Sequence, residues 1–370
     1  MKYLFSFILL VHAALHLLGF AKAFHLAEIN TLSQNISKPI GTLWFLTFLL
    51  FSITTAIYIK NYKFWFVFAF IALILSQILI LMFWKDAKFG TLANILILIV
   101  SLSAYGQFQF DKMVERETKE ILKDAQTKNP SFISEKDILH LPEAVKKWLI
   151  NSRVIGQEKS QTIQLKQIGE MRTKPNSKWM PFTATQTFNV QIPGFVWETK
   201  VEAMPFIWMR GRDKLYQGQG NMLIKLANLI PVVNESNNKQ LNSGAMIRFL
   251  AEICWFPSAA INNYIVWESI SKNSAKATLT IKNTSVSGIF KFSTEGDITS
   301  FETKRYYGGK TNSKLETWRI NMTSHKTFNG VKIPNKSNVS WKLKEGDFNW
   351  LNLEIIKLEK YNSEKNIIID

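Results

Sequence analysis

The distribution of apolar positions divides the chain near residue 108 into two parts. Before that point the sequence is almost continuously apolar, and after it polar and apolar residues alternate. Four apolar runs, covering residues 3–24, 40–59, 64–84 and 91–108, are each long enough to cross a bilayer as a helix, which takes about 20 residues. The pattern predicts a transmembrane bundle of four helices over residues 1–108.

The connections support this bundle. Residues 60–63 and 85–88 are short and charged, as expected between adjacent antiparallel helices. The first run resembles a signal peptide, but it lacks a clear small-x-small cleavage site and further spans follow it. We therefore expect the first run to be retained as a span.

Two helical patterns follow the last span. Residues 111–126 are charged and favour a solvated helix, which Asn-Pro-Ser at 129–131 should break. Residues 141–149 place a proline in the first turn and an apolar stripe along one side, which is typical of a packing helix. We expect a connecting helix and linker over residues 109–137 and a separate domain over residues 138–370.

Within that domain the apolar period becomes two, the period of half-buried strands. Strands are expected over residues 162–168, 180–191, 195–204, 206–210, 264–270, 276–283, 285–293, 298–307, 316–325, 330–333, 338–343 and 349–358. Residues 222–233 form a further apolar stretch. Because no helices regularly separate these strands, they favour an antiparallel sheet.

One internal helix interrupts the strands. Residues 241–250 carry apolar side chains at helical spacing, and a helix is expected over residues 244–256. Pro257 should end it by pushing the residue before it out of helical geometry. The edges of the sheet must also close or be covered. The sequence therefore predicts an α+β fold: a transmembrane four-helix bundle, then a curved antiparallel half-barrel with a short helix in its concavity.

Charge and cysteine content restrict the partners. The formal net charge is +17, and the excess is spread along strands and loops without blocks beside stacking aromatic residues. For a chain held in a bilayer this favours anionic lipid headgroups, and we expect no nucleic-acid partner. Cys254 is the only cysteine, which excludes an intrachain disulfide and a cysteine zinc cluster. No cofactor is expected.

The lysines and arginines near the spans indicate an orientation. The inner side, with both ends of the bundle inside, would hold Lys2, Lys60, Lys63, Lys112, Arg116, Lys119 and Lys123. The outer side would hold Lys22, Lys38, Lys85 and Lys88. The positive-inside rule therefore predicts a cytoplasmic sheet domain of a multi-pass membrane protein.

His12 and His16 are four residues apart in the first span and share one helix face. We expect them to hydrogen-bond a neighbouring helix. A metal site, haem ligation or proton transfer is the alternative, since ionisable groups inside a span are functional candidates. No carboxylate or cysteine in the other spans would complete a metal site.

Several motifs of the second part occur together. They are Leu-Pro-Glu-Ala-Val at 141–145, Trp-Met-Pro-Phe at 179–182, Pro-Gly-Phe-Val-Trp at 193–197, Gly-Gln-Gly at 218–220, Ala-Glu-Ile-Cys-Trp-Phe-Pro at 251–257, Val-Ser-Gly-Ile-Phe at 286–290 and Arg-Tyr at 305–306. This order resembles a bacterial domain family of unknown function over about residues 138–362. The strand series is also similar in architecture to the half-barrel of bacterial lipoprotein carriers.

The candidate chemistry lies around the internal helix. Arg248 and Glu252 are four apart and can pair as a salt bridge. Alternatively, Glu252 lies in an apolar pocket beside Trp255, where burial would raise its pKa to a value useful for acid–base work. A two-carboxylate hydrolase would need a partner, for which Asp213 is the candidate.

Three functions follow from these residues. The first is a membrane-anchored module that binds lipid or another apolar ligand between sheet and helix, with candidate ligand contacts at Arg210, Arg212, Arg248, Trp255, Trp179 and Arg305. The second is a membrane-bound hydrolase that uses Glu252 and Asp213 as catalytic residues. The third is a structural envelope protein.

Overall fold

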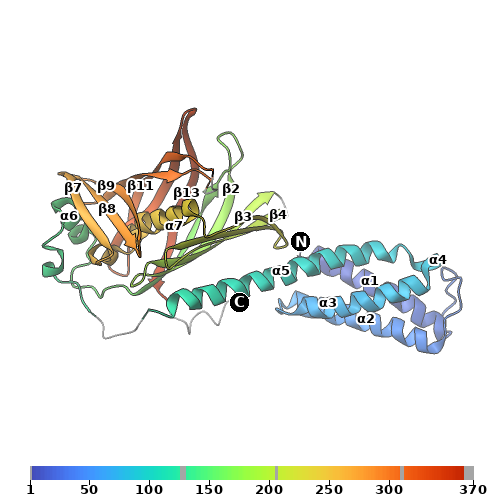
Figure 1. Ribbon diagram of the computed structural model, residues 1–370. Helices are drawn as coiled ribbons and strands as arrows, with labels where there is room; N and C mark the ends of the chain where they lie inside the picture. The colour runs from blue at the N-terminus through green and yellow to red at the C-terminus, as the bar shows by residue number, and fades with distance from the viewer. Residues whose placement is uncertain (1, 126–130, 205–206, 309–311, 362–370) are drawn as a thin grey trace. The chain divides into compact units, whose positions relative to one another are not determined.

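The computed structural model describes residues 2–125, 131–204, 207–308 and 312–361. Contacts divide the chain into two units, Met1–Lys112 and Met113–Asp370. The first contains helices and the second a 13-stranded antiparallel sheet with further helices, so the expected α+β class is confirmed (Figure 1). The finer limits at residues 108 and 137 remain a prediction.

The helices of the first unit are α1 (Lys2–Ala23), α2 (Lys38–Ile59), α3 (Trp65–Met82), the short α4 (Trp84–Ala87) and the start of α5 (Gly90–Leu122). The helices α1, α2, α3 and α5 are each long and apolar enough to span a membrane. Many large apolar side chains on them point outward, such as Phe7, Ile74 and Leu92, which are 64%, 64% and 67% exposed. Such surfaces suit a hydrocarbon environment.

One continuous helix replaces two separately predicted elements. The expected span at 91–108 and the expected charged helix at 111–126 are both parts of α5, a helix of 33 residues. The helix ends at Leu122, and the predicted break at residues 129–131 lies largely outside the described residues. The last turns of α5 belong to the sheet unit, where the carbonyl of Ile121 accepts a hydrogen bond from Asn189.

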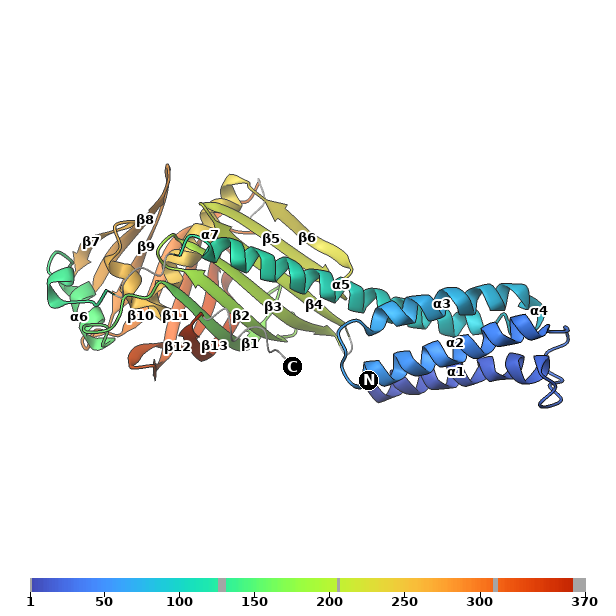
Figure 2. The same ribbon diagram turned by 90° about the horizontal axis from the view of Figure 1, so that it is seen from below.

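The sheet has its first and last strands at its centre. Its order is β6-β5-β4-β3-β2-β1-β13-β12-β11-β10-β9-β8-β7 (Figure 2). Strands β1 to β13 cover, in turn, Thr162–Met171, Met180–Asn189, Gly194–Met204, Ile207–Tyr216, Gln219–Leu226, Ile230–Ser236, Ile265–Ser271, Ser274–Ile281, Thr284–Phe292, Ile298–Tyr306, Leu315–Phe328, Val331–Leu343 and Gly346–Lys360. The apolar stretch at 222–233 contains most of β5 and the start of β6, and the two expected strands at 330–333 and 338–343 are one strand, β12.

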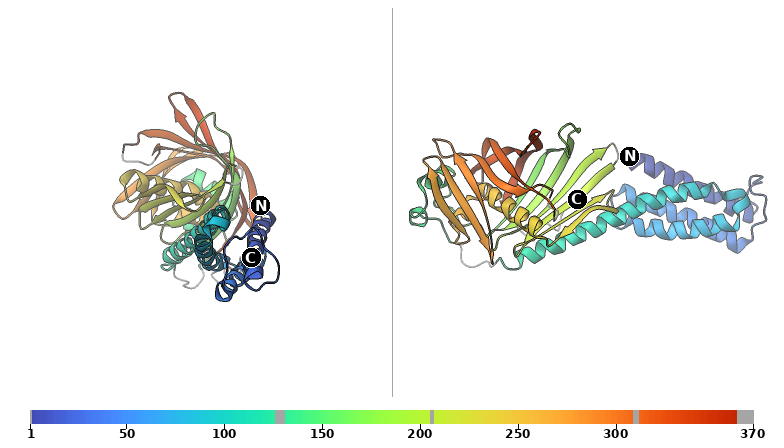
Figure 3. Two further views of the ribbon diagram at one scale, coloured as in Figure 1. Left: turned by 90° about the vertical axis from the view of Figure 1, so that its right-hand side faces the viewer. Right: turned by 45° about the horizontal axis from the view of Figure 1, so that its top comes forward.

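Local turn chemistry sets the register of these hairpins. Between β11 and β12, Asn329 and Gly330 both have positive φ (49° and 85°). An Asn-Gly pair adopts this geometry easily and joins two strands by a tight turn. The sheet curls along its length, so that β4 and β5 form one wall and β8 to β10 the other (Figure 3).

The internal helix α7 (Lys239–Glu252) lies between the two walls, against β4 and β5 on one side and β8, β9 and β10 on the other (Figure 1). Asn238 caps its N-terminus by accepting a hydrogen bond from the backbone N–H of Leu241 at 2.7 Å. The helix in the concavity is thus confirmed, but it ends before residue 256. Phe256, which precedes Pro257, is extended (φ −138°, ψ 72°), and 3-10 turns at Ile253–Trp255 and Pro257–Ile261 replace the helix.

The main core fills one end of the concavity. It unites α7, the packing helix α6 (Glu143–Asn151) and the concave residues of both walls. Trp148 of α6 lies parallel to Phe290 of β9, with ring centroids 6.4 Å apart. Trp255 is buried in this core. A short 3-10 turn, Glu135–Ile138, precedes α6.

Candidate functional site

Strand β4 sends its charged residues to opposite faces of the sheet. Side chains alternate along a strand, so Asp213 points into the concavity while Arg210 and Arg212 point away from it. Arg212 Nε lies 2.8 Å from Glu117 Oε2 of α5, and Arg210 forms an ion pair with Glu198 of β3. The structure therefore does not bring Arg210 and Arg212 to the site of Asp213.

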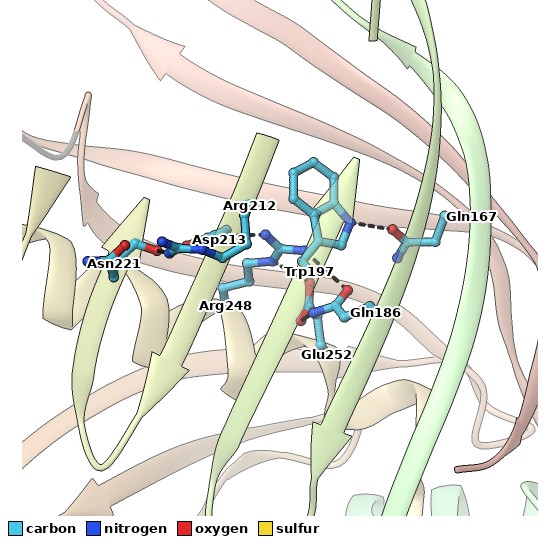
Figure 4. Close-up of polar contacts among 8 residues, drawn as sticks. All are labelled: Gln167, Gln186, Trp197, Arg212, Asp213, Asn221, Arg248 and Glu252. Carbon is cyan, nitrogen blue, oxygen red and sulfur yellow. Dashed lines mark hydrogen bonds and ion pairs between the residues drawn. The ribbon is translucent and has the colours of Figure 1, made fainter. Parts of the chain in front are cut away.

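Inside the concavity, Arg248 of α7 connects both carboxylates (Figure 4). Its Nε donates to Glu252 Oε1 at 2.7 Å and its Nη1 to Asp213 Oδ2 at 2.8 Å. Gln186 of β2 completes the network, because its amide donates to Glu252 Oε2 at 2.7 Å and accepts from Arg248 Nη2 at 3.2 Å. The guanidinium also lies over the Trp197 ring, 4.6 Å from its centroid. The expected Arg248–Glu252 pair is present, and Asp213 joins it.

This network is buried, and burial sets its electrostatics. Desolvation raises the pKa of Glu252, while the nearby Arg248 charge and the Gln186 hydrogen bond oppose that rise. Both oxygens of Glu252 are occupied by donors. A general acid or base must have an oxygen free for substrate, so this geometry suits an ion pair that orders α7 against β2 and β4. Asp213 Oδ1 is buried without a hydrogen-bond partner among the described residues.

Arg305 of β10 lies on the same concave face, on the other wall. Its guanidinium carbon is 4.6 Å from the Trp318 ring centroid and 5.9 Å from that of Trp341. A side chain at Gly244 of α7 would begin 3.4 Å from Arg305 Nε. Desolvation lowers the pKa of Arg305 to about 10, and the negative charge of Asp213 opposes that fall. Arg305 makes no hydrogen bond or ion pair with any residue that the structure describes.

A second apolar cluster lies on the concave face beyond the Arg248 network. Only three of its residues, Phe182, Ala184 and Val201, are buried. Around them are the partly exposed Met171, Met180, Trp197, Met209, Leu351 and Leu353, from β1 to β4 and β13. We call these nine residues the outer cluster. Strand register places them on one face, since Phe182 pairs with Val201, and Val201 with Met209.

The remaining candidates lie elsewhere. Trp179 is in the β1–β2 hairpin, where Arg172 lies over its ring at 4.5 Å. Trp255 packs in the main core, at the end of the concavity that this core fills. Burial raises the pKa of the Cys254 thiol well above its usual value, and the negative charge of the nearby Glu252 adds to that rise.

Sequence reasoning missed Gln186 and the outer cluster. A signal for Gln186 was present: it is a polar residue at a core-facing position, between Ala184 and Phe188, in a strand whose even-numbered residues point inward. For the outer cluster, the sequence shows only that apolar and polar residues alternate in each strand. The cluster itself could not be predicted, because its members come from five strands that become neighbours only in the folded sheet.

The two histidines of α1 lie inside the helical unit and bond to other helices. His12 Nε2 is 2.9 Å from Asn94 Oδ1 of α5, and His16 Nε2 is 3.0 Å from Ser76 Oγ of α3. These contacts agree with the interhelical hydrogen bonding that we expected. In the part of the chain that the structure describes, no three His, Cys, Asp or Glu side chains gather as metal ligands.

Comparison with protein families identifies the sheet unit. A model of the family of unknown function DUF6920 matches residues 139–359, more than half of the chain. The chain belongs to this family. The match confirms the resemblance expected over residues 138–362. Because the function of DUF6920 is unknown, the match indicates the extent of the domain but no activity. No curated protein matches the chain.

Two solved structures are similar to this DUF6920 member. A LolA superfamily protein from Nitrosomonas europaea is 11% identical with a TM-score of 0.33, and the match covers 61% of this chain and 96% of that one. A DUF1329 family protein from Desulfovibrio piger is 7% identical with a TM-score of 0.36, covering 60% and 92%. These scores are too low to assign a common fold, and the architecture stands on the sheet topology described above.

Proposed function

We propose that this protein is a membrane-anchored module that binds an apolar ligand, in the simplest case a lipid acyl chain, on the outer cluster. The observation that carries the proposal is the incomplete burial of that cluster. The main core covers its apolar residues with α6 and α7, whereas six of the nine residues of the outer cluster remain partly exposed. Apolar surface inside a concavity, next to a few fixed polar groups, is the usual form of a ligand site.

The helical unit supplies the anchor in this proposal. Its four apolar helices could hold the chain in a bilayer, which would keep lipid close to the sheet unit. Burying an acyl chain from water gains about 0.8 kcal/mol per methylene. An acyl chain that moves from the bilayer to the outer cluster only exchanges one apolar environment for another, so the net free energy gained by this transfer is small. Such a site would exchange lipid readily with the membrane.

The orientation is part of the proposal. By the positive-inside rule, the lysine and arginine count favours a cytoplasmic sheet unit. A single cysteine introduced at exposed Lys200 would report the side, because buried Cys254 does not compete for reagent. In intact cells we expect a membrane-impermeant maleimide to leave this cysteine unlabelled, and labelling without lysis would place the sheet unit outside.

Photolabelling tests the binding itself. The full chain is placed in phosphatidylcholine nanodiscs with a trace of phosphatidylcholine that carries a diazirine on its acyl chain, and labelled peptides are identified by mass spectrometry. Label in residues 1–112 is the internal positive control. We expect additional label in β3, β4 and β13, and its loss in Met209→Asp but not in Lys200→Gln, which changes the opposite face beside it. Label confined to residues 1–112 would contradict the proposal.

A further inference from the structure

The two arginines of the concavity differ in how their charges are satisfied. Arg248 pairs with Asp213 and Glu252 and bonds Gln186. Arg305 has no hydrogen bond or ion pair with any described residue, although β10 places it on the same concave face. Arg305 is half-buried, and partial burial of an unpaired charge is unfavourable. Among the charged groups of the concavity that the structure describes, Arg305 is therefore the one whose donors are free for an external anion.

The surroundings of Arg305 hold its guanidinium in place without using its donors. Its guanidinium carbon lies over the Trp318 ring, 4.6 Å from the centroid, and 5.9 Å from the centroid of Trp341, so both rings can make cation–π contacts with it. Because residue 244 is glycine, α7 can approach the guanidinium closely: a Cβ there would lie 3.4 Å from Arg305 Nε and 3.5 Å from its Nη2. Glu316 faces Arg305 across the β10–β11 pair, but the two form no ion pair. A planar guanidinium that is ordered by aromatic rings and has free N–H groups is suited to a bidentate oxyanion.

The position of Arg305 relates it to the proposed ligand. A Cβ at Gly244 of α7 would lie 3.4 Å from Arg305 Nε, and Arg248 follows four residues later on the same helix, so Arg305 lies beside the polar centre of the concavity. The outer cluster begins at the same centre, because Trp197 contacts Arg248 and is also a member of that cluster. An acyl chain bound on the outer cluster would thus have its headgroup near the positively charged guanidinium of Arg305, which would attract an acidic headgroup.

We propose that Arg305 selects the ligand by its acidic headgroup, so that the module takes an anionic amphiphile in preference to a neutral one. This inference rests on the proposed function and adds the class of ligand. The headgroup chemistry is a carboxylate or a phosphate oxyanion, which a fatty acid or an anionic phospholipid would supply. Contacts with the acyl chain cannot distinguish this ligand from the bulk lipid of the membrane. Charge-assisted hydrogen bonds from Arg305 to the headgroup would make that distinction.

The test compares three diazirine probes with the same acyl chain: a fatty acid, a phosphatidylglycerol and a diacylglycerol. Each is added to the full chain in phosphatidylcholine nanodiscs, and label in the sheet unit is divided by label in residues 1–112 to correct for the amount of probe in the disc. We expect at least one acidic probe to exceed diacylglycerol by about tenfold or more, the size of one charge-assisted contact. Whichever acid is preferred identifies the source of the oxyanion.

Substitutions assign the preference to Arg305. Arg305→Gln should remove it, Arg305→Lys should retain part of it, and Lys304→Gln, an exposed neighbour on the other face, should leave it unchanged. If Arg305→Gln does not fold, as judged by loss of Cys254 protection, the probe ratios of the wild type and of Arg305→Lys decide. Equal labelling of the sheet unit by all three probes would overturn the inference and leave the proposed function standing. Absence of sheet-unit label from every probe would overturn both.

Discussion

Arg248→Met offers the sharpest test of the buried network. The substitution keeps an unbranched side chain of similar length but removes the bonds at 2.7 Å to Glu252 and 2.8 Å to Asp213. Two carboxylates then remain buried without their cation. Removing one partner from a buried charge network typically destabilises by about 3–5 kcal/mol. For a domain of this size that corresponds to a fall in Tm of roughly 6–20 °C.

The pH dependence gives this prediction a second, independent outcome. Without Arg248, the desolvation that raises the pKa of Glu252 loses its main opposing charge, so the folded-state pKa of this carboxyl lies further above its unfolded value of about 4. The folded variant then binds more protons than the unfolded chain. Its stability is therefore greatest below the unfolded pKa and is lost as pH rises through the folded pKa. The deficit relative to wild type should shrink as pH falls from about 7.5 to about 5.

The assay is unfolding of the full chain in nanodiscs, followed by tryptophan fluorescence. Arg319→Met is the matched control, because Arg319 pairs with Glu302 at the surface and its side chain is 30% exposed. A pair of this kind contributes at most about 1 kcal/mol. A deficit for Arg248→Met no larger than that of the control, or one that grows with acid, would refute the account of the network.

Three further predictions concern other positions. Glu252→Gln keeps the shape of the side chain but loses its charge, and should lower the free energy of unfolding by about 1–3 kcal/mol without reducing lipid photolabelling; intact stability together with loss of a measurable hydrolase activity would favour the enzyme alternative. Gly288→Ala would place its Cβ 2.2 Å from the Phe301 ring, so it should destabilise by about 1–3 kcal/mol, and an unchanged Tm would argue against this packing. Cys254, whose pKa burial raises, should resist a thiol reagent at pH 8 in the folded protein and react fully in urea; fast native labelling would show that the core opens.

Much of the fold was predictable because it depends on local patterns. The spans follow from continuous apolar runs and the strands from alternation, whereas Pro257 set only an outer limit for α7, which ends at Glu252. The helix boundary at residue 108 was not predictable, since nothing in the sequence of residues 108–111 breaks a helix and α5 simply continues. The edge hairpin of β5 and β6 was seen only as an apolar stretch, because its turn at residues 227–229 has no glycine or proline.

The candidate site was predictable in part, and the limit is again physical. Arg248 and Glu252 are four apart in one helix, so their pairing follows from helical geometry. Arg210 and Arg212 were expected to contact a ligand in the concavity, but the period of two in β4 places them on the face opposite to Asp213. The isolation of Arg305 could not be read from the sequence, because it depends on which charged groups the curvature of the sheet brings within reach.

The central claim is that the outer cluster is open to an acyl chain. Met209 lies in this cluster and is partly exposed, and Cys254 is buried, so Met209→Cys creates one reactive thiol on the concave face. The most direct measurement is the rate of its modification by N-ethylmaleimide in phosphatidylcholine nanodiscs, with and without added oleate, and with Lys200→Cys on the opposite face as the control. We predict modification of Met209→Cys that oleate slows several-fold, with no effect of oleate on Lys200→Cys. A thiol at position 209 that is as unreactive as Cys254, or one that oleate does not protect, would contradict the account.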